Sequence, residues 1–222
     1  MSALAERLDR VRADISDAAN AVGRSADELT LIVVTKFHPA SLVRKLAGLG
    51  VRDVGENRHP EAGDKAAETA DLDLNWHFIG QLQTNKAKAV RKYAHAVHSV
   101  DRPGLVDALA GDRAVDCFVQ VNLTDDPNRG GVSDSDLDAL VEHVLGAEGL
   151  TLRGLMAVAP LDEPARPAFA HVRKLSERVQ RLAPNASALS LGMSHDFADA
   201  SAEGATHLRI GSAITGNRPV AG

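Results

Sequence analysis

Apolar residues follow two alternating patterns along the chain. Short runs rich in valine, isoleucine and leucine alternate with stripes of apolar residues spaced three and four apart. The runs predict β-strands, and the stripes predict amphipathic α-helices. Eight strands are expected, near residues 29–35, 51–54, 76–79, 96–99, 115–122, 151–158, 188–191 and 207–210.

The stripes place helices before and between these strands. Further helices are expected over residues 39–47, after the Ser133-x-x-Asp136 capping pattern, and over 169–182 before Pro184. The first stripe predicts a helix over residues 1–22 that ends at Gly23. Its apolar face consists of Leu4, Leu8, Val11, Ile15, Ala19 and Val22.

Regular alternation of strand and helix implies right-handed parallel βαβ units. Eight such units predict an α/β fold of the closed (β/α)8 TIM-barrel type, with an extra N-terminal helix. An open doubly wound sheet is the alternative, but it favours a glycine-rich turn after the first strand. The residues there are Thr35-Lys36-Phe37-His38-Pro39 instead.

Composition narrows the class of protein. The absence of a linker or composition break predicts a single domain over residues 1–222, and a net charge of −5 argues against non-specific nucleic-acid binding. No apolar stretch approaches the roughly 20 residues of a membrane span. Acidic residues in the first helix argue against a targeting presequence, so a cytoplasmic location is expected. The single cysteine, Cys117, excludes an internal disulfide and a cysteine-built metal site.

Lys36 directly follows the first predicted strand, at the barrel end where active sites lie. Alternation puts it on the same face as Ile32 and Val34, which would point into the barrel. A lysine at a barrel mouth can supply the amine of a Schiff base. The alternatives are a solvated lysine or an ion pair with an acid such as Glu56.

Arg209 and two glycine-containing turns lie near the end of the chain. Arg209 falls inside the last predicted strand, where it would face the barrel interior and need either a ligand or an interior carboxylate. The turns at Leu191-Gly-Met-Ser194 and Gly211-Ser212 follow strands seven and eight, where many barrels bind phosphate. Pyridoxal 5′-phosphate (PLP) requires a lysine, a phosphate-binding turn and a polar partner for its pyridine nitrogen at one site. Lys36, the two turns and Arg209 would supply these groups at one end of the barrel.

Several ordered motifs carry a closer likeness. The sequence resembles the pyridoxal phosphate homeostasis protein family of the YggS/PROSC type over nearly its whole length, from about Leu29 to Arg218. The motifs are Val34-Thr-Lys36, Gly55-Glu-Asn57, Trp76-His-Phe-Ile-Gly80 with Gln83 and Asn85-Lys86, Gly154-Leu-Met-Ala157, Leu191-Gly-Met-Ser-His-Asp196 and Arg209-Ile-Gly211.

The resemblance implies a PLP-binding barrel like the N-terminal domain of alanine racemase. It implies that Lys36 forms a covalent aldimine with PLP, that Ser194 and the backbone of Gly211 and Ser212 bind the phosphate, and that Arg209 lies near the pyridine nitrogen. Asn57 and Met156 would line the pocket. The chain departs from the family pattern at three sites, namely residues 58–62, Arg129 and Thr215.

The residues favour a PLP carrier over an enzyme. A racemase of this type needs a second acid/base, normally a tyrosine from a following domain. The chain has one tyrosine, Tyr93, and eleven residues after Gly211. An arginine at the pyridine nitrogen would also weaken PLP as an electron sink. We expect a monomer that stores PLP or delivers it to PLP-dependent apo-enzymes.

Other functions are weaker alternatives. A PLP enzyme of low, racemase-like activity is the first, and a cofactor-free Schiff-base lyase is the second. Lys86 lies in a basic segment that is expected to be a solvated helix face, but it could capture a second PLP. No metal site is expected, because the nine histidines show no ligand spacing.

Overall fold

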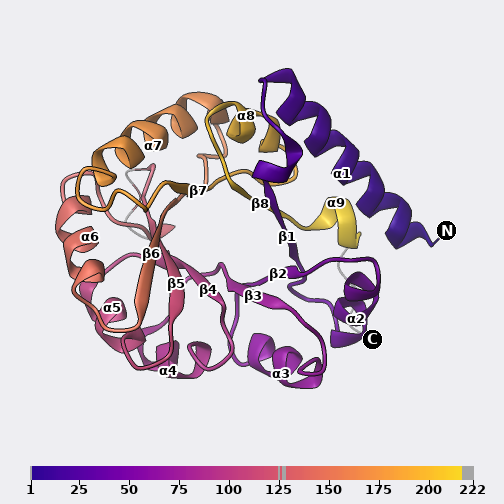
Figure 1. Cartoon of the computed structure of the whole chain (residues 1–222), viewed down its shortest axis with the longest axis horizontal. Coiled ribbons are helices and arrows are strands. Elements are labelled where there is room, and N and C mark those ends of the chain that lie inside the picture. Colours follow the sequence, from indigo (N-terminus) through magenta and orange to yellow (C-terminus); the bar gives the residue numbers. More distant parts are fainter. Residues whose placement is uncertain (1, 125, 127–128, 217–222) are drawn as a thin grey trace.

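The computed structural model describes residues 2–124, 126 and 129–216. Its strands pair in parallel in the order β1 to β8, and β8 closes on β1. Figure 1 shows the helices arranged around this closed barrel. The structure thus confirms the predicted (β/α)8 fold with an extra N-terminal helix.

The eight strands match the predicted runs closely. The last strand has the predicted bounds, and most others end within two residues of them. The strands are β1 Thr30–Val34, β2 Asp53–Glu56, β3 Asn75–Phe78, β4 Ala96–Val100, β5 Val115–Gln120, β6 Leu150–Met156, β7 Ala188–Ser190 and β8 His207–Ile210.

Helices and helical turns connect the strands. The basic helix, predicted over Lys86–Tyr93, is shorter in the structure: a 3-10 turn (η2, Thr84–Lys86) precedes α4, which ends at Val90. The helices are α1 Ala3–Ala21, α2 Ala40–Gly48, α3 Glu61–Glu68, α4 Ala87–Val90, α5 Pro103–Leu109, α6 Leu137–Leu145, α7 Ala165–Val179, α8 Phe197–Ala202 and α9 Ser212–Thr215. A further 3-10 turn, η1 (Ala26–Glu28), precedes β1.

The core lies in two layers. A large aliphatic cluster fills the space between the strands and the helices, and Val33 belongs to it. Ile32 and Val34 are buried but lie outside that cluster, as expected for side chains that face the barrel interior. A small interior cluster consists of Ala96, Phe118 and Met156.

Helix α1 covers the region where the barrel closes. It packs against α8 and α9 (Figure 1), and Arg7 Nε donates a 2.7 Å hydrogen bond to the carbonyl of Ile214. Its predicted apolar face is buried except at the end. Val22 is 41% exposed because the helix ends at Ala21 and Val22 caps it. Met1, with which the predicted helix began, lies outside the described residues.

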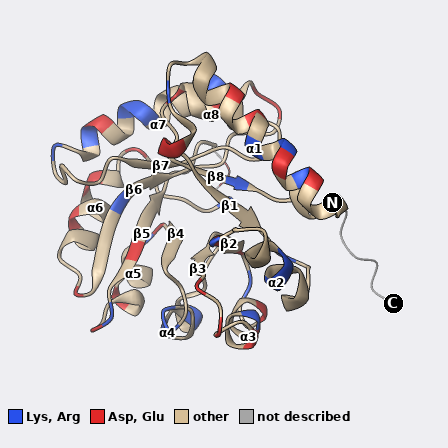
Figure 2. Cartoon of the chain, turned by 45° about the vertical axis from the view of Figure 1, so that its right-hand side comes forward, with Lys and Arg blue, Asp and Glu red and all other residues tan. Residues whose placement is uncertain are grey.

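Charged residues occur along the surrounding helices and in the segments that connect them to the strands (Figure 2). Arg44 and Asp71 form one surface pair, with 2.8 Å between Nη2 and Oδ1. None of the helices in the described part of the chain is long and apolar enough to cross a membrane.

Candidate functional site

The predicted site residues come together at one end of the barrel. Because all eight strands are parallel, their C-terminal ends form one rim. The register puts Val34 beside Gly55 and Val33 beside Ile210, so the residues after β1, β2 and β8 are neighbours. The predicted residues at the C-terminal ends of the strands or just beyond are Lys36, Asn57, Met156, Ser194, Gly211 and Ser212, with Arg209 inside β8.

Lys36 presents an exposed amine at this rim. It follows the buried Thr35, whose backbone N–H donates a 2.9 Å hydrogen bond to the carbonyl of Gly55. The next residue, Phe37, has a left-handed φ of 68°, which is uncommon for a residue other than glycine. The amine lies 5.8 Å from the centroid of the Phe37 ring, and the Arg58 guanidinium lies 5.5 Å from the same ring.

Glu56 does not pair with Lys36; its partner is Lys65 of α3. Lys65 Nζ lies 2.6 Å from Glu56 Oε1 and 3.0 Å from the carbonyl of Thr35. Thr35 Oγ1 donates to the same carboxylate oxygen at 2.7 Å. Both charged groups are buried, so this pair supports the backbone immediately before Lys36. Sequence reasoning missed Lys65; the available signal was its place beside the inward-facing Ala62 and Ala66.

Arg209 is 5% exposed and faces the barrel interior, as alternation predicted. Nη1 donates to the carbonyl and the hydroxyl of Ser190, both at 2.6 Å, and Nη2 donates to the carbonyl of Ala157 at 2.9 Å. Within the described residues no ion pair joins it to a carboxylate. Burial lowers the pKa of the guanidinium to about 10, against a smaller opposing effect of Asp196, so it stays charged at neutral pH.

Two turns bring backbone amides and hydroxyls to the rim. Gly192 has a φ of +85°, and an added Cβ there would lie 2.7 Å from Ala200 Cβ, so only glycine fits. Ser194 follows this turn and is partly exposed. Gly211 precedes α9, whose backbone bonds begin with Ile214 N–H to the carbonyl of Gly211. The first amides of a helix have no acceptor within the helix and can meet an anion.

Asn57 and Met156 have different environments. Asn57 Oδ1 is buried and, among the described residues, has no hydrogen-bond partner, which suits an atom that meets a ligand. Met156 is 2% exposed and packs with Ala96 and Phe118 inside the barrel.

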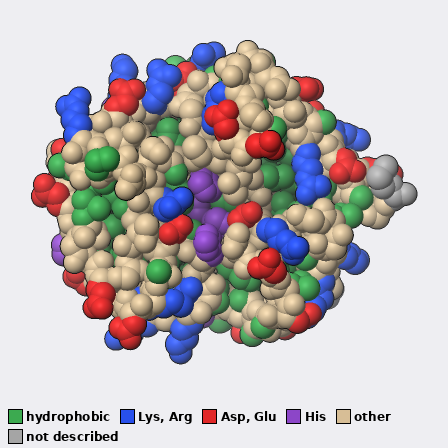
Figure 3. Space-filling model, in the orientation of Figure 1, with side chains coloured by type: hydrophobic (Ala, Val, Ile, Leu, Met, Phe, Trp, Pro, Cys, Tyr) green, Lys and Arg blue, Asp and Glu red, His purple; other side chains and the backbone are tan. Residues whose placement is uncertain are grey.

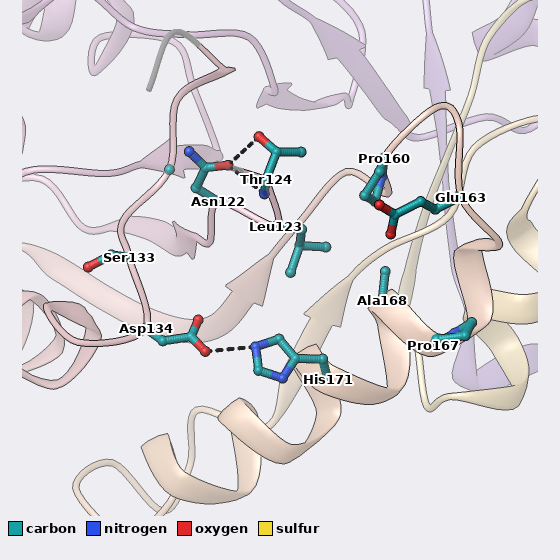
Figure 4. Close-up of a pocket in the computed structure, with 11 residues that line it drawn as sticks. Asn122, Leu123, Thr124, Ser133, Asp134, Pro160, Glu163, Pro167, Ala168 and His171 are labelled. Carbon is teal, nitrogen blue, oxygen red and sulfur yellow. Dashed lines mark hydrogen bonds and ion pairs between the residues drawn. The ribbon is translucent and has the colours of Figure 1, made fainter. Parts of the chain in front are cut away.

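Cavities open beside the rim. One, of about 700 Å³, lies between the segments after β5 and β6, where His171 Nε2 and Asp134 Oδ2 are 2.8 Å apart (Figure 4). Another, of about 490 Å³, is lined by Asn57, Gln81 and Lys86 among others. Lys86 therefore lies closer to the predicted site than its expected role on a solvated face implies.

A second polar group lies at the opposite end of the barrel. The first residues of several strands line a cavity of about 260 Å³, and Figure 3 shows histidines gathered at the centre of this face. Burial is the main cause that lowers the pKa of His77, of His98 and of His207, the last to about 4. These imidazoles are therefore neutral at pH 7.

Acid is expected to destabilise the protein through these histidines. An unfolded histidine titrates near pH 6.5, whereas folded His207 takes up its proton near pH 4. Between these values the unfolded state binds more protons, so the free energy of unfolding decreases as the pH decreases, by about 2 kcal/mol between pH 7.5 and pH 5 for His207 alone. Urea denaturation at pH 7.5 and pH 5 measures the loss. His207→Gln should flatten this dependence, and a loss in this variant equal to that of the wild type would contradict the assignment.

Sequence comparison identifies close relatives of known family. The model of the family "Alanine racemase, N-terminal domain" matches residues 7–219. The pyridoxal phosphate homeostasis protein of Pseudomonas aeruginosa is 42% identical over 226 residues, covering 98% of this chain and 97% of the relative. The protein of the same name from Escherichia coli is 37% identical over 230 residues, covering 98% of each.

Structural comparison finds the same barrel in solved proteins. PipY of Synechococcus elongatus, solved with PLP bound, superposes with a TM-score of 0.82 at 35% identity and covers 95% of this chain and 99% of PipY. Alanine racemase from Corynebacterium glutamicum shares the fold, with a TM-score of 0.73 at 16% identity over 97% of this chain and 62% of the racemase. The chain therefore belongs to the pyridoxal phosphate homeostasis protein family, whose barrel is that of the alanine racemase N-terminal domain.

Proposed function

We propose that this chain binds PLP at the C-terminal end of its barrel and serves PLP homeostasis. Residues 1–222 form one binding domain that acts as a cytoplasmic monomer and stores PLP or delivers it to PLP-dependent apo-enzymes. The observation that carries the proposal is the meeting, at one rim, of the exposed Lys36 amine, the buried Arg209 guanidinium and the two turns at Ser194 and Gly211. The names of the relatives and the PLP-bound PipY support it.

The residues present fit the chemistry of PLP. Bound PLP supplies an aldehyde and an anionic phosphate. The Lys36 amine would condense with the aldehyde to an aldimine, with loss of one water. The Ser194 hydroxyl and the amides of Gly211 and Ser212 are donors for the phosphate, and Arg209 is a donor for the pyridine nitrogen. Asn57 Oδ1 and Met156 complete the lining, and the unpaired oxygen of Asn57 would gain a partner.

Two features support a carrier rather than an enzyme. Arg209 remains a charged donor, which disfavours protonation of a pyridine nitrogen beside it and so weakens PLP as an electron sink. The one tyrosine, Tyr93, stacks on His59 with 6.1 Å between ring centroids, and burial raises the pKa of its hydroxyl. It is therefore poorly suited to donate or accept a proton at neutral pH.

A titration tests this function directly. Adding PLP to the purified protein is expected to produce a saturable visible absorption band that differs from that of free PLP. The loaded protein should convert L-alanine far more slowly than about 1 per second, a rate typical of slow enzymes. Absence of a saturable band would refute PLP binding, and racemisation at enzymatic rates would refute the carrier role.

A further inference from the structure

A continuous line of hydrogen bonds runs through the barrel interior and ends at Arg209. It passes through five side chains that come from β2, β3, β4, β7 and β8. The bonds join Asp53 Oδ1 to His77 Nε2 (2.9 Å), His77 Nδ1 to His98 Nε2 (2.9 Å), His98 Nδ1 to Ser190 Oγ (2.8 Å) and Ser190 Oγ to Arg209 Nη1 (2.6 Å).

The two ends of this line fix the direction of every bond in it. A guanidinium can only donate, so Ser190 Oγ accepts from Arg209. At the other end, burial raises the pKa of Asp53, but hydrogen bonds from His77 and Asn75 outweigh it and leave the pKa below its ordinary value. Asp53 is therefore ionised at neutral pH and can only accept, so His77 must donate to it through Nε2–H.

The histidines between these ends have one consistent assignment. His77 is neutral and protonated on Nε2, so its Nδ1 is an acceptor. His98 must then donate through its Nε2–H, which leaves His98 Nδ1 to accept from the Ser190 hydroxyl. Hydrogen bonds that point the same way polarise one another. The line therefore connects the buried Arg209 cation to a carboxylate on the far side of the barrel.

The far end of the line opens into the 260 Å³ cavity at the N-terminal ends of the strands. Asp53, His77 and His207 line this cavity, and the other titratable or charged side chains there are His95, Asp116 and Arg153. Asp116 lies near His95 and Arg153, at 4.0 and 3.5 Å, and takes no part in the line. The chain thus offers a carboxylate in the same cavity that serves as a matched control.

We propose that Asp53, His77, His98 and Ser190 are positioning residues for Arg209, which donates into this line and is held in place by it near the rim at the other end of the barrel. This inference rests on the proposed function, because it gives the held guanidinium the pyridine nitrogen of PLP as its target. A substitution in the cavity at the N-terminal ends of the strands should therefore change the position of Arg209, and with it PLP binding, at the opposite end of the barrel.

Histidine NMR tests the line before any cofactor is added. In the protein without PLP, ¹⁵N-resolved spectra at pH 7 should show His77 and His98 each protonated on Nε2 only. In Asp53→Asn the acceptor-only end is lost, since an amide can also donate, and the signals of His98 should change although His98 does not touch Asp53. Asp116→Asn should leave them unchanged. An Nδ1–H tautomer or a cationic ring at either histidine in the wild type would overturn the proposal.

PLP binding tests the consequence at the rim. Ser190→Ala and Asp53→Asn are each expected to weaken PLP binding about fivefold or more and to shift the bound absorption band. The controls are Ser201→Ala, at a buried serine bonded to the Phe197 carbonyl, and Asp116→Asn; both should bind like the wild type. Unchanged affinity and spectrum in the first two would overturn the positioning role. Failure of the wild type itself to bind PLP would refute the proposed function instead, and the NMR result would stand apart from it.

Discussion

Alanine in place of Lys36 is expected to abolish covalent capture of PLP and to leave the fold intact. Lys36 is exposed, and its contact with the Phe37 ring is worth at most about 1 kcal/mol, so the free energy of unfolding should change little. Capture should be lost completely, because the variant has no amine at this point of the rim. The measurement is the mass of the protein after incubation with PLP and borohydride reduction.

Peptide mapping gives the control for this result. In the wild type one modified lysine is expected, at Lys36, and Lys86→Ala should retain it. Lys86 is the sharpest comparison, since it lines a cavity with Asn57 and is therefore near the same rim. Full modification of Lys36→Ala would place the aldimine on another lysine, and a second adduct at Lys86 in the wild type would establish a second PLP site.

Methionine in place of Lys65 is expected to destabilise the protein by about 3–5 kcal/mol, since it leaves the Glu56 carboxylate buried without its cation. Glu56 Oε2 already has no hydrogen-bond partner among the described residues, so the carboxylate has little alternative support. Urea denaturation at pH 7.5 gives the measurement. The change should also weaken PLP binding, because Lys65 holds the Thr35 carbonyl beside Lys36.

A double variant separates lost charge pairing from lost packing. Adding Glu56→Gln to Lys65→Met removes the buried charge and should restore at least half of the lost stability. Lys45→Met, at an exposed lysine of the neighbouring α2, should cost less than about 0.5 kcal/mol. A loss in Lys65→Met no larger than this would show that the Glu56–Lys65 pair contributes nothing.

The hydrophobic pattern predicted the barrel because strands that are buried on both faces read as continuous apolar runs. It placed β8 correctly at 207–210 and misplaced β2, which begins at Asp53 rather than at residue 51 and extends through Glu56. From the local sequence, the strand is expected to end before the acidic residue Glu56, because a buried carboxylate is unfavourable. Glu56 continues it because Lys65, nine residues later, neutralises the carboxylate from the next helix.

The site was predictable where one residue broke a local rule. Arg209 stood out because alternation placed a charge in the interior, and Lys36 because it directly followed an apolar strand. The interior line was not predictable in the same way. Its five members stand in five different strands, and the three between Asp53 and Arg209 each resemble an ordinary buried histidine or serine. Only barrel closure brings Ser190 and Arg209 beside His98, a residue 92 positions away from Ser190.

The hydrogen bonds of Arg209 also have a thermodynamic consequence. Its guanidinium is fastened to the carbonyls of Ser190 and Ala157, on the shortest strand of the barrel and just beyond β6. This long side chain therefore loses its rotamer freedom when the chain folds. The guanidinium donor is already ordered before a ligand binds. The loss of side-chain conformational entropy that normally weakens ligand binding by an arginine has therefore already occurred on folding, and PLP binding does not repeat it.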